Sequence, residues 1–450
     1  MENREKILSG DLIKTVWHLA WPNITTALLT TVNMLTDRFF VGRLGEGSIA
    51  IVTSVWFYMW LFYGSSQALS TGNIALVARF VGQGKIRKAE QSARQSLILG
   101  VVVAGLFTAI SVIWTEPIFK LLGIAQNLYP QAKLYFYPLV FSSFLSYGIF
   151  SLLSNLRGLG DMLVPLRILV IVNLLCIVLD YLLIFGHWGL PRLGILGAGV
   201  AMVAARTCGV ILLYWAHKLH KDFNLFSGSF APKYLWIYRI LRLGSPLVAQ
   251  NLIRSLGGLF LLGILARTQD GTAAVAAIGV GMVIEGFAYM PAVGYAMAAT
   301  TMVGQNLGAE STERAEKSGW IAAYQGAMIM GIVAVLFAIF AAPIARVFSS
   351  HPATIHLICT YFWINAVSEP FLGLAIVLSG ALEGAGDTRI PTLISICTIW
   401  CLRVPLAFLF CSALKLHPNF VWLAMSLSTI AQGIWITARF RGGKWKTARV

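Results

Sequence analysis

The stretch LRGLGD at residues 156–161, followed by Pro165, has a near copy in LEGAGD at residues 382–387, followed by Pro391. The two prolines are 226 residues apart, about half the chain. Two further pairs keep almost the same order and spacing: VGQ at residues 81–83 and 303–305, and Pro22 and Pro246. Three anchors at nearly one offset predict an internal duplication, and in a hydrophobic chain this organisation is typical of a path between two similar halves.

The composition predicts an integral membrane protein. Of 450 residues, 58% are hydrophobic and only 12% are charged, with a mean hydropathy of +0.76. That is too little polar surface to cover a soluble globule. Alternating strands of about ten residues, which an outer-membrane barrel needs, are absent from the sequence. Apolar stretches of spanning length recur at 15–37, 48–76, 96–115, 134–154, 164–186, 195–216, 243–266, 273–301, 319–342, 355–382, 390–412 and 419–438.

These stretches predict an all-α protein with twelve transmembrane helices, six in each half. Because six is even, both halves enter the membrane from the same side, and the repeats are parallel. We expect an N-terminal six-helix lobe at 1–216, a cytoplasmic linker at 217–242 and a C-terminal lobe with a cytoplasmic tail at 243–450. The linker is rich in Lys, and residues near Tyr234 to Tyr238 are expected to lie on the membrane surface.

The net charge of +16 is explained by topology. With the amino terminus in the cytoplasm, 23 of the 34 Lys and Arg residues fall on the cytoplasmic side and 8 on the other, with Arg206, Arg254 and Arg403 inside spans. This positive-inside bias predicts that both termini are cytoplasmic, and no nucleic-acid partner is needed to explain the basicity. The polar start, without a cleavable signal, suggests that the first span is its own insertion signal.

The sequence offers no enzymatic or nucleotide-binding motif. The six cysteines fall in or beside apolar spans without metal-ligand spacing, so neither disulfides nor a metal site is expected. The stretch Gly82-Gln83-Gly84-Lys85 lacks the spacing and the Ser or Thr of a phosphate-binding loop. Uphill movement would therefore depend on an ion gradient.

Ionisable side chains inside apolar spans are costly, and each is a functional candidate. In the first half, Asp37 and Asp180 are such groups, with Asn33 and Cys176 one helical turn before them. Burial disfavours the charged carboxylate, so each could bind a proton on one side of the membrane and release it on the other. The structural alternative is a hydrogen bond or a pair with Arg38 or Arg206.

The second half also carries intramembrane charges, for which mutual neutralisation is the stronger alternative. Candidates for a substrate cavity share polar or polarisable side chains within spans: Glu285, Glu369, Arg254, Arg206, Met282 and Tyr289. Aromatic and methionine side chains suit bulky apolar cations. Most such residues in membrane proteins simply face lipid, which is the alternative here.

With these residues in view, the chain resembles the multidrug and toxic compound extrusion (MATE) transporters over its whole length. The resemblance is carried by residues 294–309, 380–391, 37–45 and 179–186. It implies two six-helix lobes forming a V around a central cavity, cation-driven export of drug-like compounds, and coupling-ion carboxylates at Asp37 and Asp180.

Three departures from relatives with a Na⁺ site favour proton coupling. Cys176 stands where many carry Asn, Met202 where they carry Thr, and Arg254 where some carry Glu. Sulfur is a poor ligand for a hard cation.

We therefore expect a proton-driven, or alternatively Na⁺-driven, antiporter that exports organic cations by alternating access and needs no cofactor. It is expected to be a monomer in a prokaryotic inner membrane, in contact with lipid. A flippase of lipid-linked sugars is the alternative within transport, and a polytopic membrane enzyme the alternative outside it.

Overall fold

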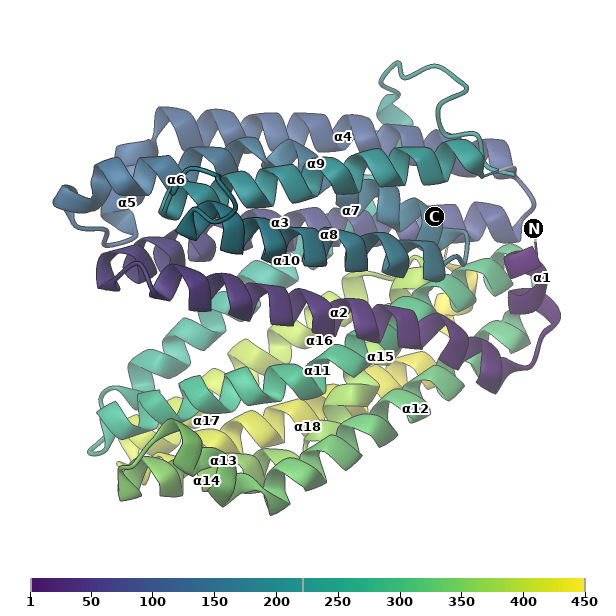
Figure 1. Cartoon of the computed structure of the whole chain (residues 1–450). Helices are drawn as coiled ribbons and strands as arrows, with labels where there is room; N and C mark the ends of the chain where they lie inside the picture. Colours follow the sequence, from purple (N-terminus) through teal and green to yellow (C-terminus); the bar gives the residue numbers. More distant parts are fainter. Residues whose placement is uncertain (1, 221, 449–450) are drawn as a thin grey trace. The chain divides into compact units, whose positions relative to one another are not determined.

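The computed structural model describes residues 2–220 and 222–448. These residues form helices and connecting loops, with no strand among them (Figure 1). The chain divides into two compact units. Unit 1 contains residues 25–244, and unit 2 contains residues 2–24 and 245–448.

Two long helices pass from one unit to the other. Helix α2 (Leu12–Gly42) begins in unit 2 and continues in unit 1 from Thr25, while α10 (Tyr234–Leu265) begins in unit 1 and continues in unit 2 from Ser245. Each changes unit within a few residues of a proline of the repeated pair, Pro22 and Pro246. The first helix of each repeat therefore starts in the unit formed mainly by the other repeat.

Unit 1 is a bundle of long apolar helices. α8 packs against α9, and α3, α4 and α7 all pack against one another. The remaining helices of this unit are α3 (Glu46–Gly82), α4 (Ile86–Ile113), α5 (Thr115–Leu121), η1 (Gln126–Leu128), α6 (Tyr129–Phe141), α7 (Ser143–Gly158), α8 (Leu163–Phe185) and α9 (Ile195–Leu219).

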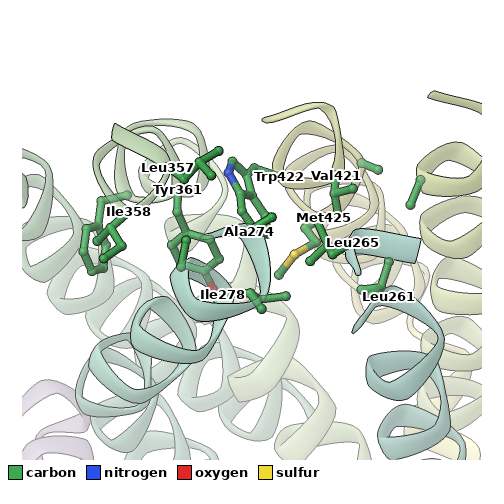
Figure 2. Packing of buried hydrophobic residues seen from close by; sticks show 14 of the residues in the cluster. Leu261, Leu265, Ala274, Ile278, Leu357, Ile358, Tyr361, Val421, Trp422 and Met425 are labelled. Atoms are coloured by element: carbon green, nitrogen blue, oxygen red, sulfur yellow. The ribbon is translucent and has the colours of Figure 1, made fainter. Parts of the chain in front are cut away.

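Unit 2 packs α11 against α12 and α15, with α15 also against α18. Its other elements are α1 (Glu2–Ser9), α11 (Gly271–Gly308), α12 (Thr312–Ile339), α13 (Ala341–Phe348), α14 (Pro352–Ala366), α15 (Glu369–Ala385), α16 (Arg389–Cys397), η2 (Thr398–Arg403), α17 (Val404–Phe408), η3 (Leu409–Ala413), α18 (Asn419–Arg441) and η4 (Lys444–Thr447). Its apolar core joins α10, α11, α14 and α18 around Ile278, Tyr361 and Trp422 (Figure 2).

The prediction of an all-α membrane protein built from two six-helix repeats is confirmed. Ten helices in the described part are long and apolar enough to cross a membrane, and the bent pair α14 and α15, with 56° between them, would form an eleventh. The remaining predicted span corresponds to α2, whose apolar sequence is interrupted by Thr and Asn. The predicted domain boundaries and the V-shaped arrangement of the lobes stay predictions.

The duplicated stretch that opens the sequence forms the same helix ending twice. Gly160 and Gly386, with φ of 85° and 92°, end α7 and α15 in a left-handed conformation that favours glycine. The backbone N–H of the following aspartate then bonds the carbonyl five residues earlier, Leu156 or Leu382, at 2.9 Å in both copies. The repeat in sequence is thus a repeat in structure.

Candidate functional site

The two carboxyl groups predicted in the first half lie near each other in unit 1. Asp37, on α2, is 2% exposed, and Asp180, on α8, is 1% exposed. They are close enough to interact electrostatically. On insertion scales, one ionised Asp at the centre of a membrane helix costs about 3 kcal/mol, so two such neighbours strongly favour at least one bound proton or cation.

Much of the hydrogen-bonding capacity of this carboxylate pair is unused. Among the described residues, neither Asp37 oxygen accepts a hydrogen bond, and Oδ1 of Asp180 also has no partner. Oδ2 of Asp180 accepts a long hydrogen bond of 3.6 Å from the Cys176 thiol. Neither carboxylate forms an ion pair with Arg38 or Arg206 in this part of the chain, so neutralisation by these arginines does not account for the pair.

Asn33 connects α2 to α8 beside the carboxyl groups. Its Nδ2 donates to Oδ1 of Asn173 at 2.9 Å, while Nδ2 of Asn173 donates to the Leu169 carbonyl at 2.7 Å. The buried Oδ1 of Asn33 keeps a free lone pair. Sequence reasoning missed Asn173, although it lies three residues before Cys176 on the face of α8 that carries Asp180.

Aromatic side chains with unpartnered polar atoms complete the cluster. The indole N–H of Trp56, on α3, faces Asp37 in a contact looser than a hydrogen bond, and the Tyr135 hydroxyl, on α6, interacts with both carboxyl groups. The Tyr63 ring packs against Trp56 at a tilt of 43°, with ring centroids 5.7 Å apart. The sequence analysis did not single out Trp56 or Tyr135, because periodicity does not show which face of a span is enclosed.

Arg206, predicted as a cavity residue, lies near the same cluster, but its guanidinium contacts Ser142 and Tyr63 instead of a carboxylate. Its guanidinium donates to Ser142 Oγ at 2.5 Å and lies 5.2 Å from the centre of the Tyr63 ring. It still contributes a positive field near Asp37 and Cys176. A cavity of about 300 Å³ lies beside this arginine contact and is lined by Pro138, Phe141, Ser142, Leu145, Val200 and Val203.

Unit 2 brings together a second set of the predicted residues. The Tyr361 hydroxyl donates to Oε2 of Glu285, and Glu369 lies close to the same carboxylate. Arg403 is held by Ser428 and is near Glu285, without an ion pair among the described residues.

Two of the remaining candidates form a separate contact. Arg254 donates weakly to the Tyr289 hydroxyl at 3.4 Å and lies over its ring at 5.7 Å. Met282 is exposed on α11. None of these contacts by itself assigns a substrate role to these residues.

Neither set resembles a metal centre. Among the residues that the structure describes, no three His, Cys, Asp or Glu side chains are arranged to hold a metal ion. Both sets instead combine buried carboxyl groups with polar atoms that lack partners, which is an arrangement suited to binding protons or monovalent cations. The fold that holds both sets is that of a polytopic membrane protein.

The chain belongs to the MatE family, whose model matches residues 22–182 and 246–409. Each matched segment covers most of one repeat. Membership confirms the resemblance drawn from the sequence and points to a transporter, not an enzyme.

Curated relatives include a probable multidrug resistance protein NorM from Thermotoga maritima, which is 28% identical over 98% of this chain and 94% of the relative. A protein named FAD transporter from Shewanella oneidensis is 24% identical over 91% of this chain and 90% of its own length. Among solved structures, a Vibrio cholerae MATE transporter, VcmN, matches with a TM-score of 0.89 at 20% identity over all of both chains. At that identity the likeness concerns the fold alone.

Proposed function

We propose that this chain exports organic cations across a prokaryotic inner membrane in exchange for protons, by alternating access. The observation that supports this most directly is the Asp37–Asp180 pair, because three of its four oxygens have no hydrogen-bond partner among the described residues. A purely structural pair of buried carboxyl groups is expected to have its oxygens satisfied. Oxygens left free in an apolar lobe can gain and lose a proton without breaking the packing around them.

The neighbours of the pair favour a proton over Na⁺. A Na⁺ site needs several oxygen ligands around one point, but the side-chain partner of Asp180 on its own helix is the thiol of Cys176, at 3.6 Å. The indole N–H of Trp56 can donate to a carboxylate but cannot ligate a cation, whereas the Tyr135 hydroxyl can both donate and accept. Na⁺ coupling is the alternative, in which Asn33 Oδ1 would be the additional ligand.

In this mechanism, protonation removes the charge of Asp37 and lets its segment of α2 repack against α8. The two helices are already linked by the Asn33–Asn173 hydrogen bond and by contacts of the Phe40 ring with Tyr181 and Phe185 at 6.0 and 5.9 Å. A change in charge at one point of this interface therefore acts on the whole helix pair. Both termini are proposed to be cytoplasmic, and no resident cofactor is involved.

The test is efflux of a fluorescent organic cation, ethidium, from proteoliposomes with a pH gradient and a Na⁺ gradient imposed separately. Wild-type protein is expected to transport under the pH gradient, and Asp37→Asn is expected to lower the coupled rate at least tenfold. Asp270→Asn is the matched control, because this exposed carboxylate precedes α11 outside the cluster. It should transport at the wild-type rate.

Full pH-driven transport by Asp37→Asn would contradict the mechanism. Transport under the Na⁺ gradient alone would mean that the coupling ion is Na⁺ and not a proton. If ethidium does not move under either gradient but FAD does, the proposed substrate class is wrong, and the relative named FAD transporter becomes the better guide.

A further inference from the structure

The segment that connects the two repeats, residues 220–233, lies at the side of unit 1. Figure 1 shows it in teal, projecting sideways beside α4, near the start of α4 and the end of α9. Two α4 side chains hold its described part. Glu90 accepts the Asn224 N–H at 2.8 Å, and Arg94 donates to the Leu225 carbonyl at 3.2 Å. The position of the segment is therefore fixed by α4.

The side chains of this segment divide into an inner and an outer set. Phe223 and Leu225 are fully buried, whereas Phe226 and Phe230 are 39% and 41% exposed. The two exposed rings stack, with centroids 6.5 Å apart and 25° between their planes. The segment thus presents two phenyl rings outward, although a loop in water normally carries polar side chains there.

The outer rings continue an exposed stripe of α9. This helix is long and apolar enough to span a membrane, and Ile211, Trp215 and Leu219 lie exposed at successive turns of it. Phe226 packs on Tyr214, beside this stripe, at 4.7 Å between ring centroids. Tyr214 lies five residues before the end of α9, which is about 8 Å along the helix axis. The segment therefore folds back along α9, toward the membrane.

Positive charge surrounds these aromatic side chains. Lys218 lies one turn beyond Tyr214 on α9, with its Nζ 5.1 Å from the centre of the Trp215 ring. Residues 214–242 contain five Lys or Arg residues and a single acidic residue, Asp222. An indole beside an ammonium group at the end of a spanning helix is typical of the headgroup layer, where the ring meets acyl chains and the ammonium meets phosphate. The excess of positive charge favours an anionic lipid over a zwitterionic one.

The level of the exposed rings favours lipid over a partner protein. Because Phe226 lies beside Tyr214, a protein that covered it would have to approach within the length of the α9 span. A bilayer already surrounds such a span, and its lipids cover apolar rings without a further binding event. The ammonium group at Lys218 adds the charge that selects among those lipids.

We propose that Tyr214, Trp215, Lys218, Phe226 and Phe230 form a binding surface for an anionic phospholipid. The acyl chains contact the two phenyl rings, and the lipid phosphate pairs with the Lys218 ammonium group. The bound lipid keeps the connecting segment at the membrane surface and is not the transported compound. The inference therefore does not depend on the proposed function.

The test is native mass spectrometry of the detergent-purified full-length protein, titrated with phosphatidylglycerol or with phosphatidylcholine of identical acyl chains. Wild-type protein is expected to bind phosphatidylglycerol more tightly. Lys218→Gln should lower that affinity about fivefold, the effect of one basic residue near a membrane surface, and leave phosphatidylcholine binding unchanged. Lys88→Gln is the matched control, because this exposed lysine near the start of α4 carries the same charge outside the proposed surface. It should bind both lipids as wild-type protein does.

Equal affinity of wild-type protein for the two lipids would overturn the proposal, as would equal losses in Lys218→Gln and Lys88→Gln. The aromatic part has its own variant, Phe226→Ser combined with Phe230→Ser. Since both rings are partly exposed, this variant should still fold, and it should bind both lipids several times more weakly. Unchanged binding by it would contradict the role of the rings.

A photo-cross-link in cell membranes identifies what covers the rings. With benzoylphenylalanine in place of Phe230, irradiation is expected to attach a phospholipid, seen as a mass increase on the peptide that contains this position. A cross-link to another polypeptide, or to neither, would reject the lipid surface. Neither measurement involves transport, so failure of the antiport mechanism would leave this inference standing.

Discussion

Gly281 makes room for the contact between Tyr361 and Glu285 in unit 2. It lies one helical turn before Glu285, and a Cβ built on it would come within 2.5 Å of the Tyr361 ring. Only a glycine leaves α11 close enough to α14 for the Tyr361 hydroxyl to reach Glu285. The ring itself cannot move aside, because it is 1% exposed and packed against Trp422.

Gly281→Ala is therefore expected to lower the free energy of unfolding by about 1–3 kcal/mol, as overpacking of a buried contact does. The measurement is thermal unfolding of the detergent-purified protein. Gly279→Ala is the matched control on the same helix, since nothing lies within 4 Å of its Cβ. There the better helix propensity of Ala should leave the melting temperature unchanged or raise it, and an equal loss in both variants would contradict the packing argument.

The sequence pointed to the charged candidates but not to the side chains that surround them. Asp37, Asp180, Glu285 and Glu369 stand out because a charge is costly in an apolar span. Trp56, Tyr135 and Tyr361 do not, since an aromatic residue in a membrane helix can face lipid or line a site, and most face lipid. Which of the two applies depends on neighbours that are distant in sequence.

Hydrogen bonds hold the segment between the two repeats against helix α4. The sequence predicts a polar linker at 217–242, but α9 extends to Leu219 and α10 begins at Tyr234, so the connection between the two helices is shorter, 220–233. In unit 1, Gln95 on α4 receives the Lys233 N–H at 2.8 Å and donates to the Ala231 carbonyl at 2.9 Å. Arg94 donates to the Leu225 carbonyl at 3.2 Å, and Glu90 accepts the Asn224 N–H at 2.8 Å. The described part of this segment is thus fastened to the start of α4.

Gln95→Ala removes both bonds to the end of the linker, so trypsin should cleave after Lys233 several times faster than in wild-type protein. The cause is local, because only two backbone groups lose a partner, at about 1 kcal/mol each. Timed proteolysis with mass spectrometry of the fragments measures the effect. Gln83→Ala, an exposed glutamine near the preceding turn, is the control, and equal cleavage rates in all three proteins would show that Gln95 does not hold the linker.

At the scale of the whole molecule, the distribution of Lys and Arg predicts that both termini lie in the cytoplasm. A fluorescent protein fused after Val450 should therefore fluoresce in bacterial cells, and alkaline phosphatase fused there should be inactive. Phosphatase fused after Thr268, in the turn between α10 and α11, should be active because this turn is predicted on the other side. Active phosphatase at the carboxyl terminus would reverse the predicted orientation, and with it the direction of transport.

The sequence by itself determined the membrane class, the duplication and the positions of the spans. All three follow from local composition and from a repeat in the sequence, which do not depend on tertiary contacts. It also placed the costly charges. Tertiary structure decided the partners: Asn173 beside Asn33, Trp56 beside Asp37, and Tyr361 beside Glu285. It also decided that the first helix of each repeat starts in the unit formed mainly by the other repeat. The physical reason is that hydrogen bonds and close packing contacts join residues far apart in the sequence, 140 positions apart for Asn33 and Asn173. Periodicity along one helix carries no information about which other helix meets it.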